Sequence, residues 1–362
     1  MCLCYMEPQN LTGILEFQLL GLSDDPELQP LFFGIFLPMY LITLLGNLLI
    51  ILAISSDSHL HTPMYFFHSN LSLADIGFSS SIIPTILVNV HTHPKSITYA
   101  DCLTQVSCFS LFGCLDSIVL SLMAYDQVVA ICHPLHYPVI MNPYLCGWLF
   151  LVSFFISLLD SLMHCLMVSQ LTFCTDVEIP HFFCDLPQLF KLACDYISTN
   201  SILIYVIGAI FGGVPVSGIF YSYIRIVSSI LRVPSTSGKY KAFSTCGSHL
   251  SVVCLFYGTG MGEYFSSVVS NAPRKIMIAS MMYIMVTLML NPFVYSLRNK
   301  DIKQALWRLL SKTAYHEYMG HIFLVCGLEK MEIEASRIEN QASLAKQVFV
   351  GLKLFITLML HI

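Results

Sequence analysis

Long stretches without charged residues alternate with short polar segments along most of this chain. Five stretches contain no Asp, Glu, Lys or Arg: 28–56, 127–159, 196–224, 242–262 and 276–297. Two more are apolar but interrupted by acids, since 63–90 contains Asp75 and 102–130 contains Asp116 and Asp126. A helix of about 20 apolar residues crosses the hydrocarbon core of a bilayer. The pattern therefore predicts seven membrane-spanning helices, near 31–54, 63–88, 102–130, 143–168, 197–225, 241–265 and 275–297.

The composition points to lipid as the main solvent. Of the 362 residues, 56% are hydrophobic and 11% are charged, and the mean hydropathy is +0.72. So few charges do not coat a water-exposed surface of this size, which argues against a soluble globular protein. The net charge of -5 also argues against nucleic-acid binding, which needs a clustered basic face.

Basic residues in the short loops predict the orientation in the membrane. One side of the membrane has four basic residues: Lys95, Lys191, Arg274 and Lys275. The other side has nine: Arg225, Arg232, Lys239, Lys241, Arg298, Lys300, Lys303, Arg308 and Lys312. The side richer in Lys and Arg faces the cytosol, so the amino terminus is expected outside. Asn10-Leu11-Thr12 is an N-glycosylation acceptor, which works only on that outer side. No cleavable signal peptide is expected, because residues 1–30 contain no Lys or Arg and five acids.

Four cysteines lie on the predicted outer side of the membrane. They are Cys102, Cys174, Cys184 and Cys194. An oxidising compartment permits two bridges among four cysteines, with three possible pairings, and free thiols are the alternative. The other cysteines in the spans and on the inner side are interpreted as small packing residues.

Five motifs occur in a fixed order on the predicted spans. They are Pro63-Met64-Tyr65-Phe66-Phe67 with Leu73-Ala74-Asp75, Met123-Ala124-Tyr125-Asp126, Ala130-Ile131-Cys132-His133-Pro134-Leu135-His136-Tyr137, Lys241-Ala242-Phe243-Ser244-Thr245-Cys246, and Asn291-Pro292-Phe293-Val294-Tyr295-Ser296-Leu297-Arg298-Asn299-Lys300. Together they closely resemble the olfactory receptor family of rhodopsin-like G-protein-coupled receptors, over roughly residues 10–310. The resemblance implies an all-α membrane protein, a seven-transmembrane helix bundle of the plasma membrane. It also implies that an odorant binds among the outer halves of the helices. The inner face would then activate a heterotrimeric stimulatory G protein and raise cAMP.

The resemblance also suggests how the chain is divided. We expect an extracellular amino terminus over 1–30, a seven-transmembrane receptor domain over 31–297, and an atypical cytoplasmic tail over 313–362. Between them, 298–312 contains Lys300, Lys303, Trp307, Arg308 and Lys312. This pattern is typical of a basic amphipathic helix that lies on the inner leaflet and contacts lipid.

The resemblance places an odorant pocket on two of the predicted helices. The implied residues are Phe109, Ser110, Gly113, Cys114, Tyr257, Gly260, Met261 and Tyr264. Within each set, the spacing places side chains on one helix face, although an aromatic stripe of this kind also serves simple packing. This wall has a few hydroxyls and no strong charge. It therefore suits a small neutral volatile molecule better than an amine or an anion.

For the outer cysteines, the resemblance implies bridges between Cys102 and Cys184 and between Cys174 and Cys194. The first would hold the loop after the fourth helix over the pocket, as a lid. The second would close a local ring within that loop.

Asp75 and Asp116 are predicted at mid-membrane depth, where an ionised side chain costs at least ~2.5 kcal/mol. They are therefore expected to share a cation, a proton or polar partners. The resemblance places a sodium ion beside both acids, together with Asn47 and Asn291. Two protonated acids within the bundle are the alternative. No other cofactor is expected.

The resemblance implies that a set of residues on the inner side of the membrane takes part in switching and G-protein coupling. Pro292 breaks the backbone hydrogen-bond ladder of the seventh helix, and Asn291 can satisfy the freed groups, which predicts a hinge. Tyr223 and Tyr295 hold the active arrangement in similar receptors. An Arg after Asp126 pairs with that acid in the resting state. It then meets the G protein once the sixth helix swings outward.

This chain departs from the family's pattern at several positions. It has Asp126-Gln127-Val128, and Gln cannot supply the cation of the usual Arg. Leu288 stands where Pro is usual, and Phe154 where Trp is common, changes expected to loosen packing. The alternative function is therefore a receptor-shaped membrane protein with weak or no G-protein coupling.

Enzyme and transporter functions find little support in the sequence. His316 and His321 are five residues apart, so they diverge on a helix, unlike the four-residue spacing of a His-Glu-x-x-His zinc site. We found no nucleophile constellation and no phosphate-binding loop. An inverted repeat, which many transporters contain, is also lacking.

Overall fold

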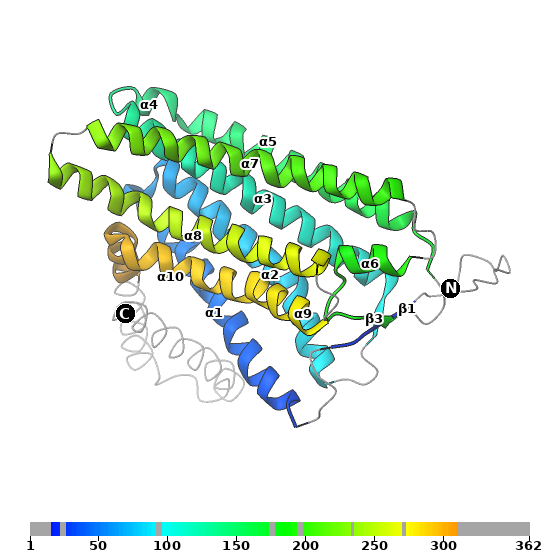
Figure 1. Ribbon diagram of the computed structural model, residues 1–362. Helices are drawn as coiled ribbons and strands as arrows, with labels where there is room; N and C mark the ends of the chain where they lie inside the picture. Colours follow the sequence, from blue (N-terminus) through cyan, green and yellow to red (C-terminus); the bar gives the residue numbers. More distant parts are fainter. Residues whose placement is uncertain are drawn as a thin grey trace, which may run out of the picture.

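The computed structural model describes residues 16–21, 27–91, 96–173, 178–193, 198–232, 235–269 and 273–309. Long helices lie side by side in a bundle, with short strands and one short helix at one end (Figure 1). We call this the outer end, in keeping with the predicted orientation, and the opposite end the inner end.

The predicted seven-helix architecture is confirmed. Its helices are α1 (Gln29–Ser56), α2 (Pro63–His91), α3 (Tyr99–Cys132), α5 (Pro143–Ser169), α7 (Ser198–Arg232) and α8 (Thr236–Val269), followed by a composite seventh helix of α9 (Pro273–Met281), η2 (Met282–Thr287) and α10 (Leu288–Arg298). Within the described residues, six of these are long and apolar enough to cross a membrane. The remaining one, α8, has 34 residues and packs against α3, α7 and the composite seventh helix.

The boundary between α7 and α8 differs from the prediction. The fifth helix was expected to end near residue 225 and the sixth to begin near 241, whereas α7 ends at Arg232 and α8 begins at Thr236. Lys239 and Lys241 therefore lie in the first turns of α8 and not in a loop. Charged residues mark where a helix leaves the membrane, but the helix can continue into water.

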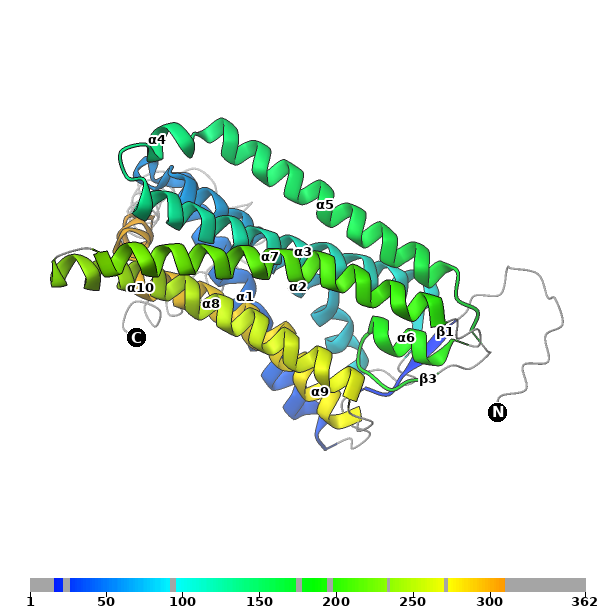
Figure 2. The same cartoon turned by 45° about the horizontal axis from the view of Figure 1, so that its top comes forward.

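Short strands at the outer end tie distant segments together. The strands β1 (Glu16–Leu19), β2 (Ser96–Thr98) and β3 (Glu178–Ile179) form one sheet in the order β2-β1-β3. β1 is antiparallel to β2 and parallel to β3. Next to the sheet lies α6 (Leu186–Leu192), in the segment between α5 and α7 (Figure 2). These elements were not predicted, because their few residues carry no distinct pattern.

Three short elements complete the inner end. They are η1 (Ser58–Leu60), α4 (Tyr137–Ile140) and a helix over 300–309. The last of these buries Ile302, Ala305 and Leu306 against residues of α1, η1 and α2, while Trp307 remains 54% exposed. Arg308 Nη1 lies 2.8 Å from Asp57 Oδ2. The predicted amphipathic helix is thus formed as far as 309, but it packs its apolar face on the bundle, and residues 310–362 lie outside the described residues.

Apolar side chains face outward as well as inward. The main core lies between α2, α3, α8 and the seventh helix, where Phe67, Ile82 and Leu120 are fully buried. On α5, by contrast, Phe155 and Leu159 are more than half exposed. An apolar outer surface of this kind suits a bundle whose solvent is lipid.

Candidate functional site

A cavity of about 570 Å³ lies among α3, α5, α7, α8, η2 and the outer loop before α6. Its size falls within the range of roughly 300–1,000 Å³ that is typical of small-molecule sites. The lining is mostly apolar, and many of its side chains are aromatic.

Seven of the eight predicted pocket residues line this cavity. They are Phe109, Ser110, Gly113 and Cys114 from α3, and Tyr257, Gly260 and Met261 from α8. The eighth, Tyr264, belongs to α8, but its side chain lies outside the described part of the structure. The structure thus brings both predicted sets to one space, and ligand binding there remains a prediction.

Aromatic rings form one wall of the cavity. The ring centroid of Phe109 lies 5.7 Å from that of Phe183 and 6.1 Å from that of Tyr283. Phe256 lies 5.5 Å from Tyr283. A Cβ on Gly260 would lie 3.2 Å from the Tyr283 ring, so glycine there allows α8 to approach the seventh helix closely.

A hydrogen bond joins the two helices that carry the predicted pocket residues. Ser117 Oγ on α3 lies 2.7 Å from Tyr257 Oη on α8. Both residues also line the cavity. A ligand that contacts Tyr257 is therefore in a position to alter the contact between α3 and α8.

The cavity wall is more acidic than the sequence suggested. Asp160, Asp185 and Glu263 line it, together with His164. The expectation of a wall without strong charge is therefore wrong. The prediction considered eight positions on two helices. Glu263 lies on α8 but was not among them, whereas Asp160 comes from α5 and Asp185 from the outer loop. A signal was present, because Asp160 and Glu263 each end a charge-free stretch inside a spanning helix.

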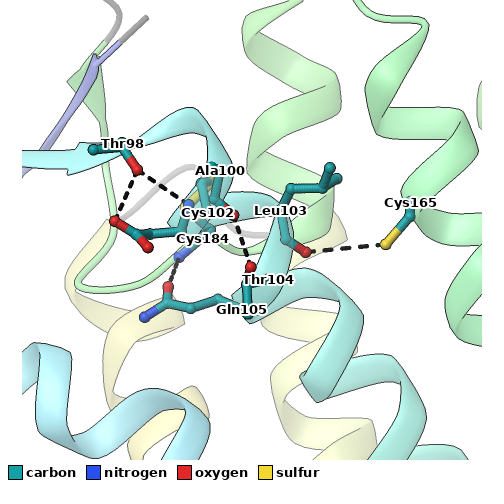
Figure 3. Close-up of a disulfide and its surroundings, with 9 residues drawn as sticks. Thr98, Ala100, Cys102, Leu103, Thr104, Gln105, Cys165 and Cys184 are labelled. Atoms are coloured by element: carbon teal, nitrogen blue, oxygen red, sulfur yellow. Dashed lines mark hydrogen bonds between the residues drawn. A yellow bond between two sulfur atoms is a disulfide. The ribbon is translucent and has the colours of Figure 1, made fainter. Parts of the chain in front are cut away.

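The outer loop reaches the cavity through a disulfide. Cys102 at the start of α3 is bonded to Cys184, with a Cα–Cα distance of 5.4 Å, as the resemblance implied (Figure 3). The backbone N–H of Cys184 also donates to Gln105 Oε1 at 3.2 Å (Figure 3). These links place Phe183, Cys184 and Asp185 in the cavity wall. The other predicted bridge, Cys174–Cys194, and the glycosylation acceptor Asn10 lie outside the described residues.

Polar contacts connect this loop to α8 and α9. His181 Nε2 lies 3.2 Å from Ser280 Oγ, and Ser280 donates to Glu263 Oε1 at 3.3 Å. Burial lowers the pKa of His181 to about 3, so its ring is neutral. Burial raises the pKa of Asp185 to about 7, although the charge of Lys191 opposes this shift.

The predicted mid-membrane acids are buried in the bundle. Asn291 Nδ2 donates to both carboxylate oxygens of Asp75, at 3.2 and 3.1 Å. Both oxygens of Asp116 and Oδ1 of Asn291 are buried with no hydrogen-bond partner among the described residues. Asn47 is buried too, and its Nδ2 donates to the Thr43 carbonyl at 3.1 Å. Within the described chain, no three His, Cys, Asp or Glu side chains cluster as metal ligands.

At the inner end, Asp126 and Gln127 are both buried. Asp126 Oδ1 accepts a hydrogen bond from Tyr137 Oη of α4 at 2.9 Å. Gln127 Oε1 is buried without a partner in the described part of the chain. The acid thus has a neutral partner on α4.

A second inner network ties α8 to its neighbours. Tyr223 Oη on α7 lies 2.8 Å from His249 Nδ1 on α8, and His249 Nε2 lies 3.0 Å from the Leu120 carbonyl on α3. Tyr295 is buried and packs its ring 3.7 Å from that of His68, centroid to centroid. Both predicted switch tyrosines therefore face the inner half of the bundle.

The irregular part of the seventh helix lies before Pro292. The segment Met282–Thr287 is π-helical, and α10 then continues through Pro292 to Arg298. The helix is thus continuous through Pro292, and a hinge at that residue remains a prediction. A π-helical turn widens the backbone ladder, and such turns are frequent at functional sites.

Comparison with known proteins places this architecture in a family. A model of the olfactory receptor family matches residues 36–313. The chain belongs to the olfactory receptor family. It is therefore a multi-pass receptor of the plasma membrane and not an enzyme.

Similar receptors cover most of this olfactory receptor. Human olfactory receptor 7E24 is 66% identical over 308 residues, 85% of this chain and 91% of that receptor. Mouse olfactory receptor 7E178 is 64% identical over 312 residues, 86% of this chain and 94% of that receptor. Human olfactory receptor 7D2 is 60% identical over 309 residues, 85% of this chain and 99% of that receptor.

Two of the unusual positions in this receptor fall in different environments. Leu288 is buried in the main core of the bundle. Phe154 is 37% exposed on the outward face of α5. A change of residue at position 154 therefore affects the lipid-facing surface more than the packing between helices.

Proposed function

We propose that this receptor binds a small odorant in the cavity between α3, α7 and α8, and that the bound receptor activates a heterotrimeric stimulatory G protein to raise cAMP. The observation that carries the proposal is the cavity itself. It is of ligand size and is lined by both predicted pocket sets. Membership of the olfactory receptor family supports the same conclusion.

The route from cavity to inner face runs along α8. Tyr257 lines the cavity and bonds to Ser117 on α3. Two helical turns further toward the inner end, His249 joins the same helix to α3 and α7. A ligand shifts a conformational equilibrium only by its differential affinity for the two states. An odorant that favours a changed Tyr257–Ser117 contact would therefore favour movement of α8.

A receptor-shaped protein with weak coupling is the second candidate. It is favoured by Gln127, which stands where similar receptors have Arg. A charge-assisted hydrogen bond contributes about 1.5–3 kcal/mol, against about 1 kcal/mol for a neutral one. Gln127 therefore lowers the maximum response in our proposal, while Tyr137 still satisfies Asp126 in the resting arrangement.

The test compares the unmodified receptor with Gln127→Arg at equal surface expression. Cells supply the olfactory-type stimulatory G protein, and cAMP is measured against a broad odorant panel. We expect the same odorants to act on both receptors, with a larger maximum for Gln127→Arg. Equal maxima would exclude position 127 as the limit on coupling. No response from either receptor would contradict the proposed function.

We further propose a sodium ion beside Asp75 and Asp116. The residues fit such an ion, because Asp116 and Asn291 offer buried oxygens without hydrogen-bond partners, and hard cations prefer oxygen ligands. Asp75, Asp116 and Asn291 would hold the ion, and its positive charge would offset the two buried acids. Two protonated carboxyl groups remain the alternative arrangement.

A further inference from the structure

Two acidic side chains face the cavity from different elements at its outer side. Asp185 lies in the loop before α6, and Glu263 lies on α8. Both line the same cavity, and the charge of Asp185 acts on Glu263. Glu263 accepts a hydrogen bond from Ser280, whereas Asp185 Oδ2 is buried without a hydrogen-bond partner among the described residues.

The charge around these two carboxyl groups is poorly balanced. Like charges in a buried site repel, so one proton or one cation must be shared for both groups to be stable. No Lys or Arg lies among the residues that line the cavity in the described structure. Lys191 acts on Asp185 from outside that lining. The third acid, Asp160, also has a buried oxygen, Oδ1, without a hydrogen-bond partner among the described residues, and His164 Nδ1 lies 3.5 Å from it.

We propose that this receptor recognises organic amines, with the ligand's ammonium group between Asp185 and Glu263 and its hydrocarbon part against the aromatic wall. The inference rests on the proposed function and adds a ligand class to the same cavity. An ammonium group supplies a positive charge inside the cavity, where no Lys or Arg lines the wall in the described structure. Its N–H groups donate to Asp185 Oδ2, which has no donor among the described residues. Phe109, Phe256 and Tyr283 form the apolar surface that covers the hydrocarbon part.

The experiment measures binding directly on purified full-length receptor in lipid nanodiscs. Thermal stabilisation is titrated with aliphatic and alicyclic amines of six to twelve carbons, each paired with the alcohol and the carboxylate of the same skeleton. We expect amines to bind at least about ten-fold more tightly than the matched alcohols, and carboxylates to bind least. Because the readout needs no G protein, it is independent of signalling.

Isosteric variants locate the charged group. Asp185→Asn and Glu263→Gln should each weaken amine binding by about ten-fold and leave alcohol binding within about two-fold. Glu178→Gln is the matched control, since Glu178 is an exposed acid in the same outer loop and does not line the cavity. Asp160→Asn should have a smaller effect than either variant, because the proposal places the ammonium group between Asp185 and Glu263 and not beside Asp160.

The outcomes separate this inference from the proposed function. The inference is overturned if amines bind no more tightly than alcohols of any skeleton, or if only Asp160→Asn weakens amine binding. If amines bind as expected but no ligand raises cAMP, the inference holds and the proposed coupling fails. If alcohols raise cAMP and amines do not bind, the coupling holds and the inference fails.

Discussion

At the residue scale, some buried polar side chains of this receptor have a hydrogen-bond partner within the described chain, and others do not. Asp126 has a neighbour in Tyr137 even though residue 127 is not Arg. Asp185 and Asp116, by contrast, each have a buried carboxylate oxygen without a described hydrogen-bond partner. A buried polar atom left in that state costs about 1–3 kcal/mol. Such atoms therefore mark where a proton, an ion or a ligand is expected to bind.

The buried Asp185 leads to a pH prediction. Its pKa is raised from 3.8 to about 7 by burial, so it is mostly protonated at pH 5.5 and mostly ionised at pH 7.5. An ammonium ligand needs ionised carboxyl groups, and Glu263, the second carboxyl group of the site, also loses its proton as pH rises. Amine affinity should therefore rise about ten-fold or more between these pH values. The thermal stabilisation of the receptor by an amine, titrated at each pH, measures this change in affinity.

Two controls accompany the pH series. Matched alcohols should show a nearly flat pH profile, and amines on Asp185→Asn should show a smaller rise than on the unmodified receptor. Without ligand the sign is reversed: since the folded receptor holds this proton more tightly than the unfolded chain, the stability that it contributes is lost as pH rises from about 4 through 7. An amine affinity that falls as pH rises from 5.5 to 7.5 would contradict this role for Asp185.

At the scale of elements, α8 connects the cavity to the inner end. It contributes Tyr257 to the cavity and His249 to the inner network. Activation in similar receptors moves this helix outward. Such a movement must break the bond between His249 and the Leu120 carbonyl on α3. That bond therefore favours the closed position of α8.

We expect His249→Phe to raise basal cAMP in cells without odorant. The ring is kept beside Tyr223, but both of its hydrogen bonds are lost. One buried hydrogen bond contributes about 1 kcal/mol net, which is about five-fold in the equilibrium between closed and open positions. Ser251→Ala is the control, since among the described residues its hydroxyl bonds only to the Gly247 carbonyl of the same helix. If His249→Phe and Ser251→Ala give the same basal cAMP at equal surface expression, the hydrogen bonds of His249 do not hold α8 in the closed position.

The seven spans could be predicted from sequence because the membrane excludes charge, so gaps between charges indicate the crossings. The same rule misplaced the junction of α7 and α8, where both helices extend beyond the apolar region. The pocket positions on α3 and α8 came from a resemblance to known receptors. Asp185 and Asp160 were not predicted to join them, because only the folded outer loop and the packing of α5 bring these acids to the cavity.

At the scale of the whole molecule, three regions follow one another along the bundle. They are the outer loop, which forms a lid, the cavity, and the predicted switch residues at the inner end. The Cys102–Cys184 bridge and the β2-β1-β3 sheet fix the lid at the end shown on the right of Figure 1. The composite seventh helix contributes Tyr283 to the cavity wall and Asn291 to the mid-membrane acids. The outward faces of α5 and α7 are apolar, which leaves the interior of the bundle as the path for a signal.

Adjacent glycines on α7 allow a direct test of whether odorants act through this cavity. Gly212 lines it and Gly213 does not, and a Cβ at either position meets no atom within 4 Å. Leucine at position 212 fills cavity space, whereas leucine at 213 adds an apolar side chain on the exposed face. Both variants should therefore fold and reach the surface.

The deciding measurement is the surface-normalised cAMP response to the strongest odorants of the panel, in Gly212→Leu and Gly213→Leu, each made on both the unmodified receptor and Gln127→Arg. We predict that Gly212→Leu raises the half-maximal concentration of the larger odorants at least about ten-fold, as expected when a ligand is excluded from a filled pocket. Gly213→Leu should leave it unchanged. Equal responses of the two variants to every odorant would contradict the claim that ligands act through this cavity.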